Sequence, residues 1–160
     1  MNQPPMVMHD DEFRQITTIC EALCKDANAR VVFVIDKNGQ LLAASGEADR
    51  FDSTSLASLV AGEMAATGGI AKLIGEKDFS VLFHEGTKDN LHITLVGGRV
   101  ILVVIFDKRS NLGLVRLRVK RHGDELGRVF DELLRRSQIP GAGQPFAEIT
   151  DEDIDNLFPE

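Results

Sequence analysis

The sequence predicts an α/β fold of the α+β sandwich type, in which helices cover both faces of a five-stranded antiparallel sheet. Apolar residues recur at steps of three and four in three long segments, which is the period of amphipathic helices. Five short strand-like segments rich in apolar residues lie between these helices. The breaks between successive strands are short and have turn chemistry, which favours antiparallel pairing. The predicted order is therefore α-β-β-α-β-β-β-α, followed by an acidic tail.

The first part of this order is a helix at about residues 10–26, whose apolar positions share one face. Residues 31–35 form a short β-branched run, and residues 41–44 return as a second strand. An Asn-Gly pair stands between the two runs, and this pair is the strongest short signal for a hairpin turn. We therefore expect a helix followed by a β-hairpin.

A second helix is expected at about residues 53–75, and it is unusually rich in small residues. Each glycine inside a helix costs about 1 kcal/mol relative to alanine, so several of them need a physical reason. The larger apolar residues are expected to lie on the sheet: Leu56, Leu59, Val60, Met64, Ile70, Leu73 and Ile74. Four small residues form a separate stripe: Ala61, Gly62, Ala65 and Gly69. From the residues alone, this stripe is either a platform on which another main chain can come close or tight packing on the protein's own sheet.

Residues 79–84, 91–96 and 100–106 predict the last three strands. The segment 100–106 is apolar throughout, which predicts a central strand covered on both faces. The segment 91–96 alternates between apolar and polar residues, so one face is expected to be wet and His92 is expected at the surface. A third helix at about residues 111–136 completes the domain.

Charge is unevenly placed along the chain, whose formal net charge is −7. Residues 140–160 hold six acidic residues and no Lys or Arg, whereas the remaining chain is almost neutral. The third helix carries a basic patch of Arg116, Lys120 and Arg121, which is either a solvated face or a binding surface for an acidic partner. A nearly neutral body argues against nucleic acid as a partner.

The sequence offers no complete active site, cofactor motif or metal-ligand spacing. Cys20 and Cys24 share one helix face, but two ligands are too few for a structural zinc site, so we interpret them as core cysteines. No apolar run reaches the length that a membrane span needs, and no signal peptide is recognisable, which predicts a cytoplasmic protein.

A resemblance to a known family rests on four stretches that span nearly the whole chain. They are KDANARVVFVIDKNGQL (Lys25–Leu41), STSLASLVAGEMAATGGIAKLIGE (Ser53–Glu76), VILVVIFDKRSNLGLVRLRVK (Val100–Lys120) and PGAGQPFAEITDEDIDNLF (Pro140–Phe158). Together with the predicted order, these stretches resemble the roadblock/LC7 family, and within it the bacterial MglB group. The first three carry the fold, and the last is the most particular to that group.

This resemblance implies a roadblock/LC7 fold and a homodimer that binds a Ras-like small GTPase of the MglA type in its GTP state. It implies GTPase activation without an arginine finger, by repositioning catalytic residues that the GTPase already has. It also implies a role in cell polarity and gliding motility, with location at a cell pole and polarity regulators as further partners. For the stripe on the second helix, it favours contact with the GTPase or with the second protomer.

The tail is expected to be a separate unit, with a roadblock/LC7 domain at residues 1–139 and a linker and acidic tail at 140–160. Ile154, Leu157 and Phe158 are spaced as anchors of a short amphipathic helix. A solubilising tail is the simpler interpretation, and the resemblance implies a second contact with the GTPase.

Two other functions stay open at this point: a roadblock adaptor that binds the GTPase without activating it, and a ligand sensor of the profilin or PAS kind. The sensor needs a pocket among the strands, for which the packed segment 100–106 leaves no obvious room. Arg50, Arg99 and Arg109 are the loop candidates for an arginine finger, and none has a distinguishing context.

Overall fold

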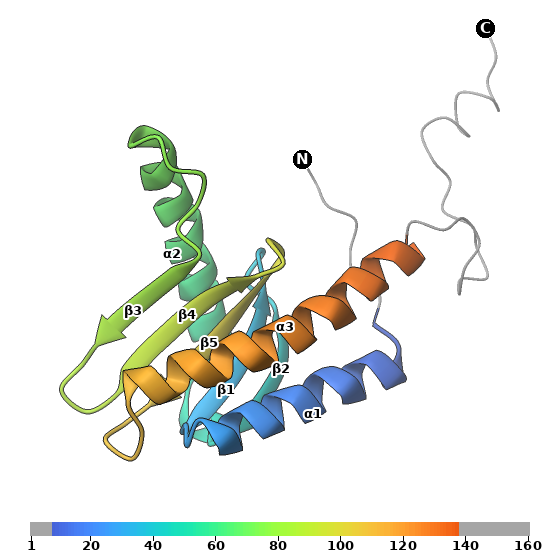
Figure 1. Cartoon of the computed structure of the whole chain (residues 1–160), viewed down its shortest axis with the longest axis horizontal. Coiled ribbons are helices and arrows are strands. Elements are labelled where there is room, and N and C mark those ends of the chain that lie inside the picture. The colour runs from blue at the N-terminus through green and yellow to red at the C-terminus, as the bar shows by residue number, and fades with distance from the viewer. Residues whose placement is uncertain (1–7, 138–160) are drawn as a thin grey trace, which may run out of the picture.

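The computed structural model describes residues 8–137 and confirms the predicted fold class and element order (Figure 1). Its boundaries agree with the expected segments to within one or two residues at most ends. The elements are α1 (Asp10–Asp26), β1 (Val31–Asp36), β2 (Leu41–Gly46), the 3-10 helix η1 (Ala48–Arg50), α2 (Ser53–Leu73), β3 (Val81–Glu85), β4 (Asn90–Val96), β5 (Val100–Phe106) and α3 (Leu112–Ser137).

The five strands form one antiparallel sheet in the order β2-β1-β5-β4-β3. The last strand, β5, pairs with β1 on one side and with β4 on the other, so it occupies the centre. Every residue of β5 is buried, as its continuous apolar run predicts. The first hairpin turns at Gly39, whose φ of +89° is a backbone conformation that favours glycine. The sheet order leaves β2 and β3 at the two edges.

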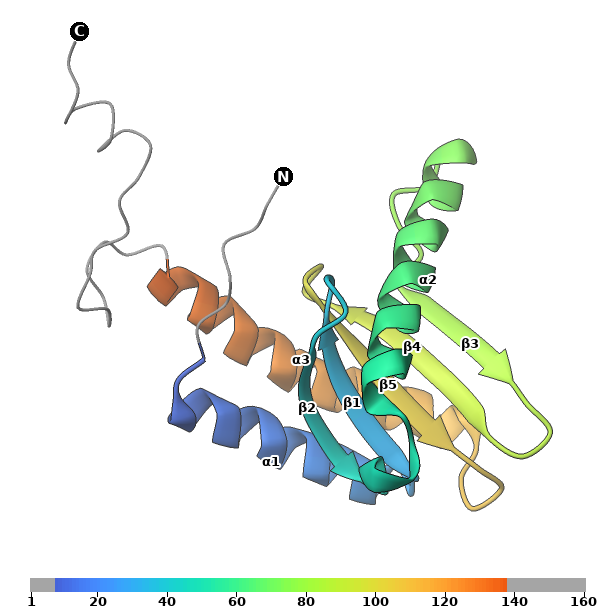
Figure 2. The same ribbon diagram turned by 180° about the vertical axis from the view of Figure 1, so that it is seen from behind.

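Helices cover both faces of the sheet (Figures 1 and 2). α1 and α3 lie side by side on one face, where Ile16, Leu23 and Leu126 pack against alternate residues of β1 and β5. α2 lies on the other face, where Ala57 and Val60 pack against the opposite set of residues from the same strands. Because successive side chains of a strand point to opposite faces, the continuous apolar runs of β1 and β5 supply both cores.

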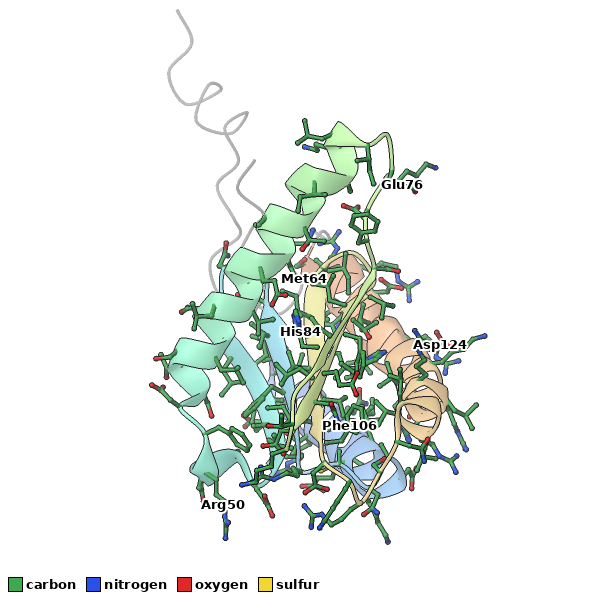
Figure 3. The ribbon with its side chains drawn as sticks, turned by 90° about the vertical axis from the view of Figure 1, so that its left-hand side faces the viewer. Arg50, Met64, Glu76, His84, Phe106 and Asp124 are labelled. Carbon is green, nitrogen blue, oxygen red and sulfur yellow. The ribbon has the colours of Figure 1, made fainter. Side chains whose placement is uncertain are left out.

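The N-terminal half of α2 lies on the sheet, and the C-terminal half extends beyond it (Figures 1 and 3). Asp52 caps the helix by accepting a hydrogen bond of 3.2 Å from the backbone N–H of Ser55. The expected sheet-facing side of this helix is wrong in part. Its buried residues are Ala57, Val60, Ala61 and Ala71, whereas four of the larger apolar residues are exposed: Leu59, Ile70, Leu73 and Ile74.

The physical reason is that short side chains allow the helix backbone to lie close to the sheet. Ala57 and Ala61 face the sheet, and the backbone of Ser58 lies 3.1 Å from a Cβ placed on Gly39 in the first hairpin. Past this close approach, the helix leaves the sheet and nothing in the described chain covers its larger side chains. The small residues therefore set the distance between layers as well as lining an outer surface.

The expected surface position of His92 is wrong, because its side chain is only 2% exposed. It lies on the face of β4 that α3 covers, together with Val96. The opposite face of β4 packs through Ile93 into the core beneath α2. Both faces of β4 are therefore covered, although apolar and polar residues alternate along the strand.

Within the described residues, no helix is both long and apolar enough to span a membrane.

Candidate partner-binding surfaces

The stripe predicted on α2 divides into a buried part and an exposed part. Ala61 is 8% exposed and packs in the core beneath α2. Gly62, Ala65 and Gly69 are exposed. A Cβ atom added to Gly62 or Gly69 would have no heavy atom of the described chain within 4 Å, apart from neighbouring helix backbone. Packing within the described part of the chain therefore gives no reason for either glycine.

Four large aliphatic side chains flank this bare surface, and sequence reasoning missed their exposure. Leu59, Ile70, Leu73 and Ile74 are 73%, 54%, 87% and 63% exposed. An exposed group of large apolar residues on one helix is typical of an interaction surface. A signal was present in the sequence: α2 has apolar residues around most of its circumference, more than one sheet face can cover.

A hollow of about 400 Å³ opens between the C-terminal half of α2 and the sheet. Met64 comes from the helix side and is labelled between α2 and the strands in Figure 3. The residues that shape the hollow include Ala61, Met64, Ala65, Gly69, Phe79 and Ile101. Three of the four predicted stripe residues therefore come together at one depression, and Gly62 lies outside its lining. Lys37, Lys72 and Asp78 also line it, so this apolar hollow carries charges of both signs at its edge.

The edge strand β3 lies beside this surface. In the described part of the chain, β3 pairs with β4 alone, and its outer edge faces no other strand. His84 of β3 contacts the carboxylate of Glu63 on α2, which ties the edge strand to the helix (Figure 3). Val81 of the same strand points to the other face of the sheet, where it lines the groove beside α3. An outer strand edge and a bare helix thus form one continuous side of the molecule.

The predicted basic patch lies on the opposite face of the sheet from α2. Arg116, Lys120 and Arg121 are all exposed on α3. Arg116 and Lys120 line a groove of about 890 Å³ between α3 and β4, whereas Arg121 lies outside its lining. The structure therefore brings two of the three basic residues together at a groove that sequence reasoning did not predict. The buried side chain of His92 lies in the same groove.

Arginine side chains near the ends of the strands differ in how they are held. Arg109 donates from Nε to both carboxylate oxygens of Asp107, at 3.0 and 3.2 Å, and this pairing raises the pKa of Arg109. Arg30, which sequence reasoning did not single out, donates to Asp89 at 2.7 Å and to Glu47 at 2.9 Å. Its guanidinium also lies 5.1 Å from the ring centroid of Phe51.

The other two predicted finger candidates lie apart from one another. Arg50 ends the 3-10 helix η1 and is exposed, and Figure 3 labels it at the opposite end of α2 from Glu76. Arg99 lies in the turn between β4 and β5, where its N–H donates to the carbonyl of Val96 at 3.1 Å. Arg99 precedes β5 and so lies at the other end of that strand from Arg109, whereas Arg30 and Arg109 both act on the Asp107 carboxylate.

The cysteines lie in the core beneath α1, as predicted. Cys20 is fully buried, and burial raises the pKa of its thiol to about 12, which keeps it protonated and unreactive. Cys24 is partly buried, and its thiol donates to the carbonyl of Ala29 at 3.4 Å. In residues 8–137, no group of three or more His, Cys, Asp or Glu side chains is arranged to hold a metal ion. The predicted tail contacts Ile154, Leu157 and Phe158, and the linker before them, lie outside the described residues.

Comparison with known families assigns the fold just described. The model of the roadblock/LC7 domain matches residues 15–106, which is more than half of the chain. The chain belongs to the roadblock/LC7 family. The match runs from α1 to the end of β5 and so includes all five strands and the whole of α2.

Among solved structures, roadblock/LC7 proteins of the MglB group are similar to this chain over most of its length. MglB of Myxococcus xanthus is 58% identical, with 79% of this chain and 96% of that chain covered and a TM-score of 0.76. The gliding protein MglB of Thermus thermophilus is 31% identical, with 82% and 99% covered and a TM-score of 0.76. A further structure, described as MglB with a tetrameric arrangement, is 30% identical with the same coverage and TM-score. Among curated protein sequences, no match to this chain is found.

Proposed function

We propose that this roadblock/LC7 protein is a homodimer that binds a Ras-like small GTPase of the MglA type in its GTP state and activates GTP hydrolysis. The observation that carries the proposal is the uncovered outer side of α2, where exposed small residues lie beside four exposed aliphatic side chains. Similarity to MglB structures supports the choice of a GTPase as the partner.

The exposed aliphatic residues favour a second protomer as one occupant of this side. Burying Leu59, Ile70, Leu73 and Ile74 in two protomers gives about 8–16 kcal/mol, at roughly 1.5–3 kcal/mol per fully buried side chain and scaled by their exposed fractions. This gain is comparable with the roughly 4–15 kcal/mol that association costs in lost freedom of motion. Strand β3 adds an edge that no other strand of residues 8–137 pairs with.

The small residues favour a partner main chain as the other occupant. Gly62, Ala65 and Gly69 project no side chain beyond a methyl group, so a strand or loop of the GTPase can approach the helix backbone closely. The adjoining hollow, lined by Met64 and Phe79, has room for an apolar side chain of that partner. Two such helices side by side in a dimer form a broad platform for one GTPase molecule.

Activation is proposed to proceed without an arginine finger. Such a residue must project into the nucleotide site with its guanidinium available to the phosphates. Arg109 is held by Asp107, and Arg30 by Asp89 and Glu47, so both are already committed within this protein. As the resemblance to the MglB group implies, the proposed route is to hold the GTPase's own catalytic residues in their productive positions, which lowers the barrier by orientation.

The proposed role in the cell is the control of polarity, with gliding motility as its readout in a gliding organism. The similar MglB of Thermus thermophilus is described as a gliding protein, which supports this role. Cytoplasmic location with accumulation at a cell pole, and contact with polarity regulators, are part of the same proposal. The segment containing Ile154, Leu157 and Phe158 is proposed as a second contact with the GTPase.

The test is single-turnover GTP hydrolysis by the MglA-type GTPase of the same organism, with and without this protein. We expect a faster reaction with the natural protein and no acceleration with Ala65→Arg combined with Gly69→Arg, whose dimer and fold are checked separately. A matched control is Gln15→Arg with Thr18→Arg, which adds the same charge to exposed positions of α1 on the other face of the sheet.

Two outcomes would contradict parts of the proposal. Binding of the GTPase with an unchanged hydrolysis rate would identify an adaptor rather than an activator. Full acceleration by the doubly substituted α2 variant would show that the GTPase docks elsewhere on the molecule.

A further inference from the structure

The groove between α3 and β4 is a large hollow that the proposed function does not use. Its volume is about 890 Å³, and it lies on the face of the sheet opposite α2. Apolar residues Val96 and Val119 line it from the strand and the helix. Two glycines of α3, Gly123 and Gly127, also line it and project no side chain into it. A Cβ atom on Gly123 would have no described heavy atom within 4 Å beyond the helix backbone, so this stretch of the wall is open.

Charge changes along the length of this groove. Arg116 and Lys120 line its first part, next to the buried side chain of His92. Asp124, Arg128 and Asp131 follow towards the C-terminal end of α3, where the Asp131 carboxylate lies near Gly97 in the β4–β5 turn. One end of the groove is therefore positive, and the other end carries both signs. A chain that fits it should be acidic at the first end and uncharged at the second.

Residues 138–158 have a matching charge pattern, in which an uncharged stretch comes first and an acidic stretch follows. Residues 138–147 carry no charge, and residues 148–155 hold five acidic residues and no basic one. Ile154, Leu157 and Phe158 supply apolar groups within and after the acidic run. The uncharged spacer comes directly after Ser137, at the end of the groove where Asp124 and Asp131 lie.

We propose that residues 148–158 dock in this groove of their own protomer, running antiparallel to α3. In this arrangement the acidic run lies on Arg116 and Lys120, the apolar side chains lie on the floor formed by Val96 and Val119, and the spacer passes the two aspartates without repulsion. The occupant is this chain's own C-terminal segment. The inference does not depend on GTPase activation, because the groove and α2 lie on opposite faces.

Distances along the chain allow this docking. Lys120 precedes Ser137 by 17 residues of helix, which is about 25 Å at 1.5 Å per residue. The ten residues 138–147 span up to about 33 Å when extended. The spacer is therefore long enough to return the first acidic residue to Lys120, with little length to spare. Binding in this groove would also withhold residues 154–158 from any other protein until they are released.

Carbodiimide cross-linking of the full chain tests the position of the docked segment. This reagent joins a carboxylate to a lysine amine only when the two are in contact, and Lys120 is the lysine that lines the groove. We expect links from Lys120 to acidic residues 148–155, and none from Lys37 or Lys72 on the α2 face. Mixing unlabelled protein with ¹⁵N-labelled protein identifies the donor of the tail. Links only within one isotope support docking in the same protomer, and mixed-isotope links would overturn it in favour of a tail from a second copy.

Amide hydrogen exchange of residues 149–158 tests the charge pairing. At low salt we expect exchange roughly tenfold slower than in an unstructured peptide, a modest protection because exposed ion pairs are weak and ordering the segment offsets most of the gain. Arg116→Glu with Lys120→Glu should abolish this protection, and adding Asp153→Lys with Asp155→Lys should restore it. The control variant Arg121→Glu with Arg135→Glu changes the same charge outside the groove and should leave protection intact.

Exchange at the unstructured rate in the natural protein would overturn the proposal. Equal loss of protection in the groove variant and the control variant would also overturn it, because the tail would then respond to total charge rather than to this groove.

Discussion

Replacing the outer glycines of α2 by alanine distinguishes their effect on helix stability from their effect on partner binding. Gly62 and Gly69 lie in the interior of a 21-residue helix, and an added Cβ at either position meets no described heavy atom beyond the helix backbone within 4 Å. Alanine stabilises an exposed helix position by about 1 kcal/mol relative to glycine. The double variant Gly62→Ala with Gly69→Ala should therefore gain about 2 kcal/mol in free energy of unfolding if nothing else touches these positions. For a protein of this size, that gain raises the midpoint of thermal unfolding by about 4–8 °C.

The same two methyl groups should weaken contact with a partner main chain. We expect the stabilised variant to bind the GTP-loaded GTPase less tightly than the natural protein, since its backbone can no longer be approached as closely. Thermal unfolding followed by circular dichroism measures the first effect, and GTPase binding by calorimetry measures the second. Gain of stability together with loss of binding would show that the glycines serve an interface rather than the fold.

Gly46 is a control position, at which alanine is expected to have the opposite effect on stability. Gly46 has a φ of +92°, and a Cβ there would lie 2.4 Å from the carbonyl oxygen of Arg30. Gly46→Ala should therefore destabilise the protein. If Gly62→Ala and Gly69→Ala destabilise it as Gly46→Ala does, the two helical glycines are packed in the protein as it exists in solution. The inference that these glycines lie on an open surface would then be refuted. They would instead be packed in the contact between two protomers.

Three further predictions follow from exposure, ion pairing and burial. Leu73→Glu should leave the protomer folded, because this side chain is 87% exposed, and should weaken dimerisation by at least about 100-fold in sedimentation, since two buried leucines each contribute roughly 1.5 kcal/mol or more. Arg→Ala at Arg50, Arg99 or Arg109 should leave stimulated hydrolysis within about tenfold, and a loss of about a thousandfold at one position would identify an arginine finger. Burial, and then the charge of Arg116, lower the pKa of His92, so folding favours its neutral form. Stability should therefore fall as pH drops below about 6.5, and this fall should be smaller in His92→Asn than in the natural protein when urea midpoints are compared at pH 7.5 and 5.5.

The helices and strands were predictable because their signals are local. Apolar spacing placed the first helix at residues 10–26, and α1 has these bounds. The continuous apolar run at 100–106 predicted a central strand buried on both faces, and β5 is that strand. An Asn-Gly pair and short breaks predicted antiparallel neighbours, which the pairing of β1 with β2 and of β3 with β4 confirms.

The faces of α2 and β4 were not predictable from the same signals. Hydrophobicity assigned Leu59 and Leu73 to the sheet, but the buried residues of α2 that pack there are Ala57, Val60 and Ala61. Alternation along residues 91–96 indicated one wet face, but α3 returns from far along the chain and covers His92. In both cases a neighbour distant in sequence decided the environment.

By itself, the sequence determined the kinds of elements, their order and the antiparallel hairpins, because helix and strand periodicity and turn chemistry act between residues near one another in the chain. It also set the separation between a nearly neutral body and an acidic tail. Only the tertiary structure decided that β5 lies between β1 and β4 and that residues 8–137 leave the aliphatic side of α2 uncovered. It also decided that Arg116 and Lys120 line a groove beside a buried histidine. These features depend on which surfaces meet when distant segments pack, and packing of that kind leaves no periodic trace in the chain.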